Sequence, residues 1–308
     1  MKSDVARFIR RGLRQGTWPL IQRYSVFRKV LDLPPVECAS DASFSAHVLV
    51  CEKDAVMAHW SLRSFLRQTS APVQIYVHDD GSCSAPTLAT LQEKFPGAVV
   101  ISRRDAEAKV LPHISSKIDL VHWWYSEYIA IKCLDFYLIG ESEWVIILDP
   151  DVLFFQEPQA LFTNSREAMW MEDCFYSLYI DPAEAQERFD VVPLQINAGV
   201  GRMLRDSIDQ SLLQEVLRFK SEKSVQERAR QRGLPRYEDQ TYHALLAARH
   251  PGSQLLPSSY QVATELGLHG VIAKHYTTPA RFWFYEEGIP RVARQLKMEL
   301  PRWLKERG

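Results

Sequence analysis

The chain has 308 residues, a length that fits one large α/β domain or two small domains. Hydrophobic residues make up 46% of it and charged residues 24%, a balance that supports a packed core and argues against disorder. Its 37 basic and 38 acidic side chains give a formal net charge of −1, which argues against nucleic-acid binding through a positive field over the whole molecule.

The five cysteines are odd in number, widely spaced and contain no Cys-x-x-Cys pair. This pattern fits neither a disulfide framework nor a zinc ribbon and indicates a reducing compartment. The apolar runs are much shorter than the roughly 18 residues that a membrane-spanning helix needs. Residues 1–11 lack the apolar region of a secretory signal. We therefore expect a cytoplasmic protein.

Both ends of the chain are rich in basic residues. Residues 1–32 hold eight basic and two acidic side chains, and residues 289–308 hold six basic and two acidic ones. Apolar residues lie between these charges at helical spacing: Val5, Phe8, Ile9 and Leu13, and Val292, Leu296, Leu300, Trp303 and Leu304. Two interpretations are open, namely peripheral attachment to an anionic membrane surface and two helices docked on the core.

From about residue 45 the hydrophobic pattern alternates between the strand period and the helix period. In chain order it predicts a strand at 46–51, a helix at 55–68, strands at 73–78 and 98–102 around a helix at 86–95, a long helix at 123–138, and a strand at 144–148. Such alternation is typical of parallel strands joined by crossover helices. Ligands of these folds gather at the carboxyl ends of the strands.

The second half of the chain is less regular. It predicts strands at 168–172, 194–203 and 271–276 and helices at 207–219 and 237–248, with the polar stretch 220–235 as the end of a helix followed by a mobile loop. We expect one α/β domain at 45–285, between a basic N-terminal arm at 1–44 and a basic amphipathic C-terminal tail at 286–308.

The strongest local motif is Asp149-Pro150-Asp151, which directly follows the apolar strand 144–148. In an extended segment residues i and i+2 point the same way, so the two carboxylates can converge on one cation. Their hard oxygen ligands favour Mg²⁺ or Mn²⁺, ions that commonly also hold phosphates. A turn and helix cap is the alternative for this motif by itself.

A second motif begins at His275, at the end of the predicted strand 271–276. Its imidazole could complete the ligands of the metal. Arg281 follows six residues later, and its planar guanidinium is suited to a diphosphate.

Together these motifs resemble nucleotide-sugar-dependent glycosyltransferases of the GT-A fold, most closely the family-8-type retaining galactosyl- and glucosyltransferases. That family has an Asp-x-Asp metal motif and a later His-(Phe/Tyr)-x-Gly-x-x-Lys-Pro-Trp segment. The segments at 149–151 and 275–283 match in order and spacing, with arginine in place of lysine at 281 and departures at Thr278 and Phe282. The resemblance implies a mixed, mostly parallel sheet flanked by helices.

The resemblance also implies roles for four further residues. Asn197 lies in an Asn-Ala-Gly-Val segment whose asparagine contacts the donor sugar in the family. Asp239 and Gln240 match an Asp-Gln pair near the centre of sugar transfer, so we take these three as the catalytic candidates. Lys132 falls where the family has an arginine that touches the donor.

The nucleotide-binding residues are less well marked. The strand 46–51 ends at Cys51-Glu52, and Glu52 could accept a hydrogen bond from the base. Asp80, after the next strand, is a candidate for ribose contact, although a structural turn explains it equally well.

The sequence therefore predicts a metal-dependent hexosyltransferase that uses a nucleoside diphosphate sugar, with UDP-sugar as the expected donor. Asp149, Asp151 and His275 would hold Mn²⁺ or Mg²⁺, and retention of configuration follows from the resemblance. The expected acceptor is a glycan, a lipid-linked sugar or a protein. Two alternatives remain open: an Asp-x-Asp phosphatase or phosphotransferase, and a non-catalytic sugar-nucleotide-binding protein on the same fold.

Overall fold

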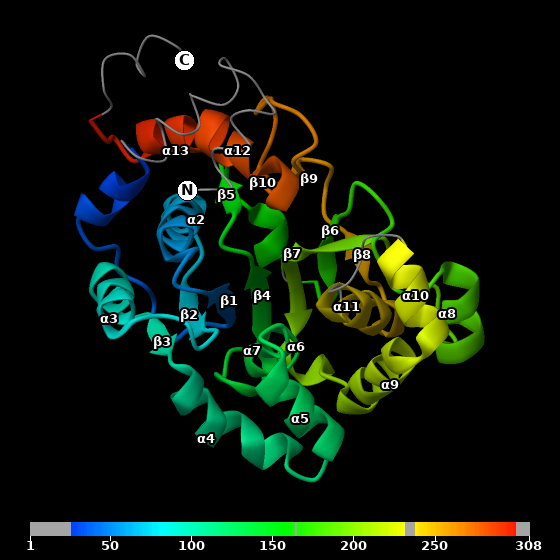
Figure 1. Ribbon diagram of the computed structural model, residues 1–308. Coiled ribbons are helices and arrows are strands. Elements are labelled where there is room, and N and C mark those ends of the chain that lie inside the picture. The colour runs from blue at the N-terminus through cyan, green and yellow to red at the C-terminus, as the bar shows by residue number, and fades with distance from the viewer. Residues whose placement is uncertain (1–25, 164, 232–237, 300–308) are drawn as a thin grey trace.

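The computed structural model describes residues 26–163, 165–231 and 238–299 (Figure 1). Its main sheet has seven strands in the order β3-β2-β1-β4-β7-β6-β8. In chain order they are β1 (Phe44–Val50), β2 (Val73–Asp79), β3 (Val99–Ile101), β4 (Trp144–Leu148), β6 (Met169–Glu172), β7 (Ile196–Leu204) and β8 (Gln254–Leu255). Every neighbouring pair is parallel except the two that include β7, which runs antiparallel to β4 and β6.

This strand order brings the ends of several strands together at one edge of the sheet, which we call the chemical edge. The carboxyl ends of β1, β2, β4 and β6 lie at the same edge, and because β7 runs the other way its amino end lies there too. The residues that follow four strands and begin a fifth therefore meet, as expected for ligand sites in parallel sheets.

A second, three-stranded sheet lies beside this edge. Its strands are β5 (Val152–Phe154), β10 (Ala273–His275) and β9 (Tyr260–Val262), with β10 in the middle. The antiparallel register of β5 and β10 pairs His275 with Val152. This register places the histidine next to the Asp-x-Asp motif, although more than a hundred residues separate them in the chain.

Helices cover both faces of the main sheet, and the strands alternate accordingly. Val145 and Ile147 of β4 face a core built with α4 (Arg103–Ile114), α5 (Ile118–Ser126), α6 (Ala130–Cys133), α7 (Asp135–Leu138), α8 (Pro182–Phe189), α9 (Gln210–Ser221), α10 (Lys223–Gln231) and α11 (Glu238–Arg249). Ile146 and Leu148 face the opposite core, with α2 (Ala55–Gln68) and α3 (Ala85–Lys94). A sheet buried on both faces explains why β4 is apolar throughout.

Most predicted elements are confirmed, and the helix predicted at 55–68 matches α2 residue for residue. The long helix predicted at 123–138 is wrong, because the chain there forms α5, α6 and α7. Trp124 Nε1 donates a hydrogen bond of 2.7 Å to Asp135 Oδ1. Eleven residues of straight helix would separate them by about 16 Å, so this contact requires the chain to fold back.

Two further elements differ from the prediction. Helix α4 was not predicted, and the stretch from residue 220, expected to be the end of a helix followed by a loop, instead completes α9 and forms a further helix, α10. Charged residues are frequent in both helices, and α10 buries only two of its nine residues, Val225 and Ala229. The loop expected up to residue 235 falls partly on residues 232–237, which lie outside the described residues.

A third apolar cluster joins the two ends of the described chain. The 3₁₀ helix η1 (Phe27–Asp32) and helix α13 (Ile289–Gln295) contribute Val30 and Val292, which are fully buried. For this part of the predicted tail the structure shows docking on the core. The remaining predicted amphipathic segments, at 5–13 and 300–304, lie outside the described residues. None of the described helices combines the length and the apolar character needed to cross a bilayer.

Close packing between the neighbouring strands β6 and β7 depends on Gly201. It pairs directly with Trp170, and a Cβ at this position would overlap the buried indole ring. We predict that Gly201→Ala destabilises the protein by about 1–3 kcal/mol, the usual cost of overpacking, measured by denaturant unfolding.

The matched control removes the obstructing ring. In a Trp170→Leu background the alanine has room, so the double variant should lose less stability than the sum of the two single variants. Additive losses would contradict this account of the contact.

Candidate active site

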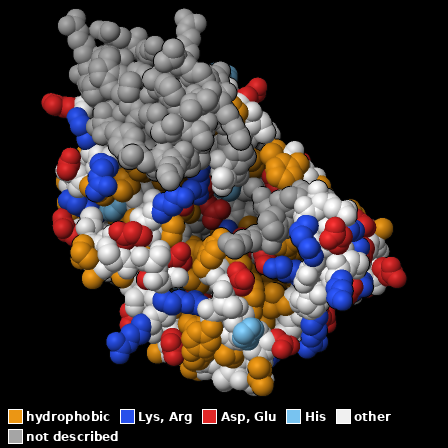
Figure 2. Space-filling model, viewed as in Figure 1, with side chains coloured by type: hydrophobic (Ala, Val, Ile, Leu, Met, Phe, Trp, Pro, Cys, Tyr) orange, Lys and Arg blue, Asp and Glu red, His pale blue; other side chains and the backbone are white. Residues whose placement is uncertain are grey.

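A pocket of about 530 Å³ opens at the chemical edge of the main sheet. This volume lies within the range of roughly 300–1,000 Å³ that is typical of small-molecule sites. Figure 2 shows acidic and basic side chains gathered in a hollow near the middle of this face. The residues that line the pocket include Asp54, Asp80, Tyr128, Lys132, Asp149, Asp151, Asp173, Phe175, Asn197, Asp239, Gln240, His275 and Arg281.

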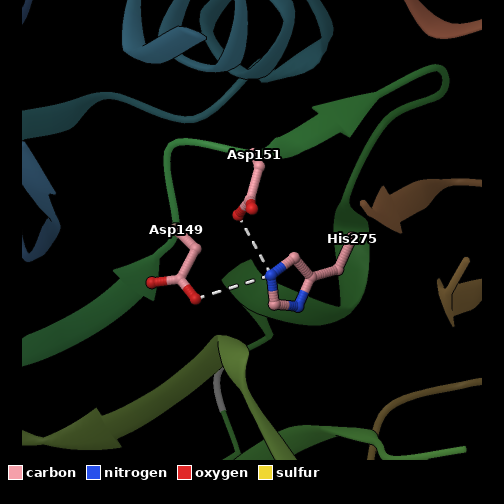
Figure 3. Close-up of side chains that lie close together, drawn as sticks. All are labelled: Asp149, Asp151 and His275. Atoms are coloured by element: carbon pink, nitrogen blue, oxygen red, sulfur yellow. Dashed lines mark hydrogen bonds and ion pairs between the residues drawn. The ribbon is translucent and has the colours of Figure 1, made fainter. Parts of the chain in front are cut away.

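Asp149, Asp151 and His275 form a cluster that could hold a metal ion (Figure 3). One ligand atom of each residue lies within 4.8 Å of the others. His275 Nε2 is 3.1 Å from Asp151 Oδ1 and 3.5 Å from Asp149 Oδ2. Two carboxylate oxygens and one imidazole nitrogen are a donor set that suits Mn²⁺ or Mg²⁺. The residues present therefore fit the ion that the sequence predicts.

The orientation of the His275 ring is set from its other side. His275 Nδ1 lies 2.6 Å from Asn197 Oδ1, and the same oxygen accepts the backbone N–H of Gly199. Because that oxygen only accepts, Nδ1 carries a proton and Nε2 faces the two carboxylates. A fixed tautomer of this kind is typical of histidine ligands. Gly199 is required here, since a Cβ would overlap the imidazole.

The charges of the cluster shift its pKa values. Burial alone would lower the pKa of His275, but the carboxylates of Asp151 and Asp149 raise it above its ordinary value. Burial raises the pKa of Asp151, but His275 and Arg281 lower it by more than burial raises it, so the net pKa is about 2. In the absence of metal the histidine therefore favours its protonated form, and a metal ion and this proton compete for Nε2.

Lys132 occupies the floor of the pocket, in the short helix α6. Its ammonium is 2.9 Å from Asp239 Oδ2 and donates to Asp149 Oδ1 and to the carbonyl oxygen of Ala198, each at 3.0 Å. Burial would lower the pKa of this group, but the two carboxylates raise it, so the side chain stays charged. The structure thus places Lys132 in the pocket as a bridge between two aspartates.

Gln240 and Asn197, two of the catalytic candidates, have fixed side chains. Gln240 Oε1 accepts the backbone N–H of Ala198, and its Nε2 donates to Asp173 Oδ2 and Ser177 Oγ. Asp239, the third candidate, lies beside Lys132 as described. All three belong to the pocket lining, so segments from β7 and α11 converge with Asp149, Asp151 and His275.

Of the predicted nucleotide-binding residues, Arg281 and Asp80 line the pocket and Glu52 does not. The Glu52 carboxylate is exposed and accepts hydrogen bonds from the backbone N–H of Ser84 and the hydroxyl of Thr87, at the start of α3. Its predicted contact with a base remains a prediction. Asp80 Oδ1 accepts the backbone N–H of Ser82, which is a turn contact as well as a pocket position.

Two pocket carboxylates were not predicted as site residues. Asp54 makes an ion pair with Arg281, and Asp173 orients Gln240. Asp173 directly follows the predicted strand 168–172, and Asp54 lies three residues after the predicted strand 46–51. Their position after strands that end at the chemical edge was the available signal, and the same rule that found Asp149 would have found them.

Metal binding by this cluster should depend on pH. Because the proton on His275 must leave before Nε2 can bind the ion, we predict that Mn²⁺ affinity rises with pH, by about tenfold per unit below the raised pKa, and then levels off. Calorimetric titration between about pH 6 and about pH 9 measures this dependence. A His275→Gln variant should bind more weakly and lose this pH dependence. Wild-type affinity that does not change over this range would contradict the assignment.

Comparisons with known proteins identify structures that share the fold of this chain. No family model matches the sequence, and no curated protein matches it either. Solved structures do match. Mouse xyloside xylosyltransferase 1 is 14% identical with a TM-score of 0.50, and the alignment covers 80% of this chain and 99% of that one.

Two further structures agree with the first. An active-site variant of LgtC is 14% identical with a TM-score of 0.52, over 85% of this chain and 99% of that chain. The bifunctional glycosyltransferase WbbM is 13% identical with a TM-score of 0.53, over 86% of this chain and 51% of that one. Identities this low show the fold alone. The predicted fold class is confirmed: this chain has an α/β fold of the GT-A type.

Proposed function

We propose that this protein is a metal-dependent glycosyltransferase that moves a hexosyl group from a nucleoside diphosphate sugar to an acceptor hydroxyl. One observation carries the proposal: within a GT-A fold, Asp149, Asp151 and His275 converge in a pocket that also holds Arg281, Asn197, Asp239 and Gln240. Fold likeness by itself would not support an activity, because one fold hosts many functions. The pocket side chains supply the chemical argument.

The leaving group of this reaction is a nucleoside diphosphate, so the site must compensate negative charge. A divalent ion held by the three ligands would supply Lewis-acid stabilisation of that charge. Arg281 adds a guanidinium at the same edge of the pocket, where its planar donors suit phosphate oxygens. Lys132 acts at longer range: its ammonium contacts the carboxylates of Asp149 and Asp239 and holds them in place, so it is not free to bind phosphate.

Asn197, Asp239 and Gln240 would bind the transferred sugar. Their amide and carboxylate groups can hydrogen-bond sugar hydroxyls, and their own side-chain contacts fix their orientation before substrate enters. The carboxylate of Asp239 would also favour positive charge at the anomeric carbon. Retention of configuration is supported by the resemblance to family-8-type enzymes, and Asp80 is proposed to contact the ribose.

For the acceptor, we propose a glycan, a lipid-linked sugar or a protein. The exposed rings of Tyr128 and Phe175 at the pocket leave apolar surface on which a sugar face could stack. Contact with an anionic membrane surface is a further proposal, supported by the basic composition of the two terminal segments. A cytoplasmic location is also proposed, and the cysteine pattern supports it.

The test is release of free nucleoside diphosphate by purified protein supplied with Mn²⁺ and, in turn, UDP-, GDP- and ADP-sugars. We predict release from one of these donors, with UDP-sugars first, and loss of release on chelation. Asp151→Asn should lower the rate at least about a hundredfold, because it weakens the ligand set that stabilises the leaving group.

Asp119→Asn is the matched control, since Asp119 is an exposed carboxylate on α5, outside the pocket lining. It should leave the rate unchanged. Manganese-dependent binding of a donor without any turnover, even with candidate acceptors, would favour the binding-protein alternative. Release of inorganic phosphate in place of the nucleotide would favour a phosphatase, and no binding at all would reject the proposal.

A further inference from the structure

Asp54 stands at the N-cap of α2 but does not cap it. Elsewhere in this chain an aspartate at the N-cap does so: Asp181 accepts the backbone N–H of Glu184 at α8, and Asp209 accepts that of Leu212 at α9. The Asp54 carboxylate accepts no such bond from the described residues. A capping hydrogen bond typically stabilises a helix, so the side chain forgoes a favourable local contact.

The carboxylate contacts Arg281 instead. Arg281 Nη1 lies 3.1 Å from Asp54 Oδ2 and 3.2 Å from Asp54 Oδ1, while its Nε donates to Asp151 Oδ2 at 2.9 Å. All three residues line the pocket, and the side chains of Asp54 and Arg281 are only 16% and 25% exposed. The guanidinium is therefore held at two of its nitrogens by two carboxylates, one of which belongs to the metal-binding cluster.

Arg281 lies at the beginning of a helical segment. It begins α12 (Arg281–Trp283), directly after the 3₁₀ turn η4 (Thr278–Ala280), and the chain continues without a break through the π-helix η5 (Phe284–Gly288) into α13. The long side chain at this first position depends on its contacts for a defined position, since free rotamers cost entropy when they are ordered on binding.

We propose that Asp54 is a positioning residue that orients the Arg281 guanidinium toward the diphosphate of the donor. The inference rests on the proposed function and adds a residue to it. Asp54 acts through Arg281: with Nη1 and Nε already held, the guanidinium plane is set before the nucleotide enters. The ligand then gains a preorganised charged hydrogen-bond donor without the entropic cost of ordering it.

The experiment compares variants of the full chain by calorimetric titration with UDP, GDP and ADP in the presence of Mn²⁺. Asp54→Ala should weaken binding of the accepted nucleotide by about tenfold, the scale of one charge-assisted hydrogen bond. Asp54→Ser is the key control, because serine is a good N-cap but is too short to replace the contact with Arg281. It should weaken binding as much as alanine does, whereas Asp54→Asn, which can still accept from Arg281, should recover part of the affinity.

A double-variant cycle separates positioning from a general effect. In an Arg281→Ala background, Asp54→Ala should cause no further loss of nucleotide affinity. Donor KM should rise more than kcat falls in the Asp54→Ala enzyme.

Three outcomes would overturn the inference. Unchanged or tighter nucleotide binding by Asp54→Ala would show that Asp54 merely masks the charge of Arg281. Wild-type affinity in Asp54→Ser would assign a capping role. If the wild-type protein binds none of these nucleotides with Mn²⁺, the proposed function fails and the inference fails with it.

Discussion

The ammonium of Lys132 carries the charge balance on which the site depends. It is buried beneath the pocket and contacts Asp149 after β4, the backbone of β7 at Ala198, and Asp239 on α11. Without this cation two aspartates would face each other in a low-dielectric environment, where an unpaired carboxylate is costly. One side chain thus joins the Asp-x-Asp motif to the predicted sugar-binding residues.

The same balance explains why the broken helix at 118–138 matters. A continuous helix would follow a straight axis, whereas α5, α6 and α7 fold back around the contact between Trp124 and Asp135. The short α6 directs Lys132 into the pocket. A local departure from regular structure therefore positions a charge that three other elements share.

The second part of the site depends on backbone that permits close approach. His275 fits between Asn197 and the two carboxylates because Gly199 lacks a Cβ. The pairing of β10 with β5 then sets the distance from the imidazole to Asp151. Such contacts on both ring nitrogens fix the orientation of the imidazole, and they come from segments far apart in the sequence.

The sequence by itself determined the elements that have a strong hydrophobic period and the residues that follow them. β4 and α2 were predicted to the residue. Asp149 and Asp151 were selected because they lie two residues apart directly after an apolar strand, and His275 because it lies at the end of another predicted strand. The tertiary structure alone decided the partners of Arg281 and Lys132 and the break after residue 126. The ion pairs between Asp54 and Arg281 and between Lys132 and Asp239 join residues about a hundred or more positions apart. No local sequence pattern encodes such contacts, because they form only when the strand order brings the segments together.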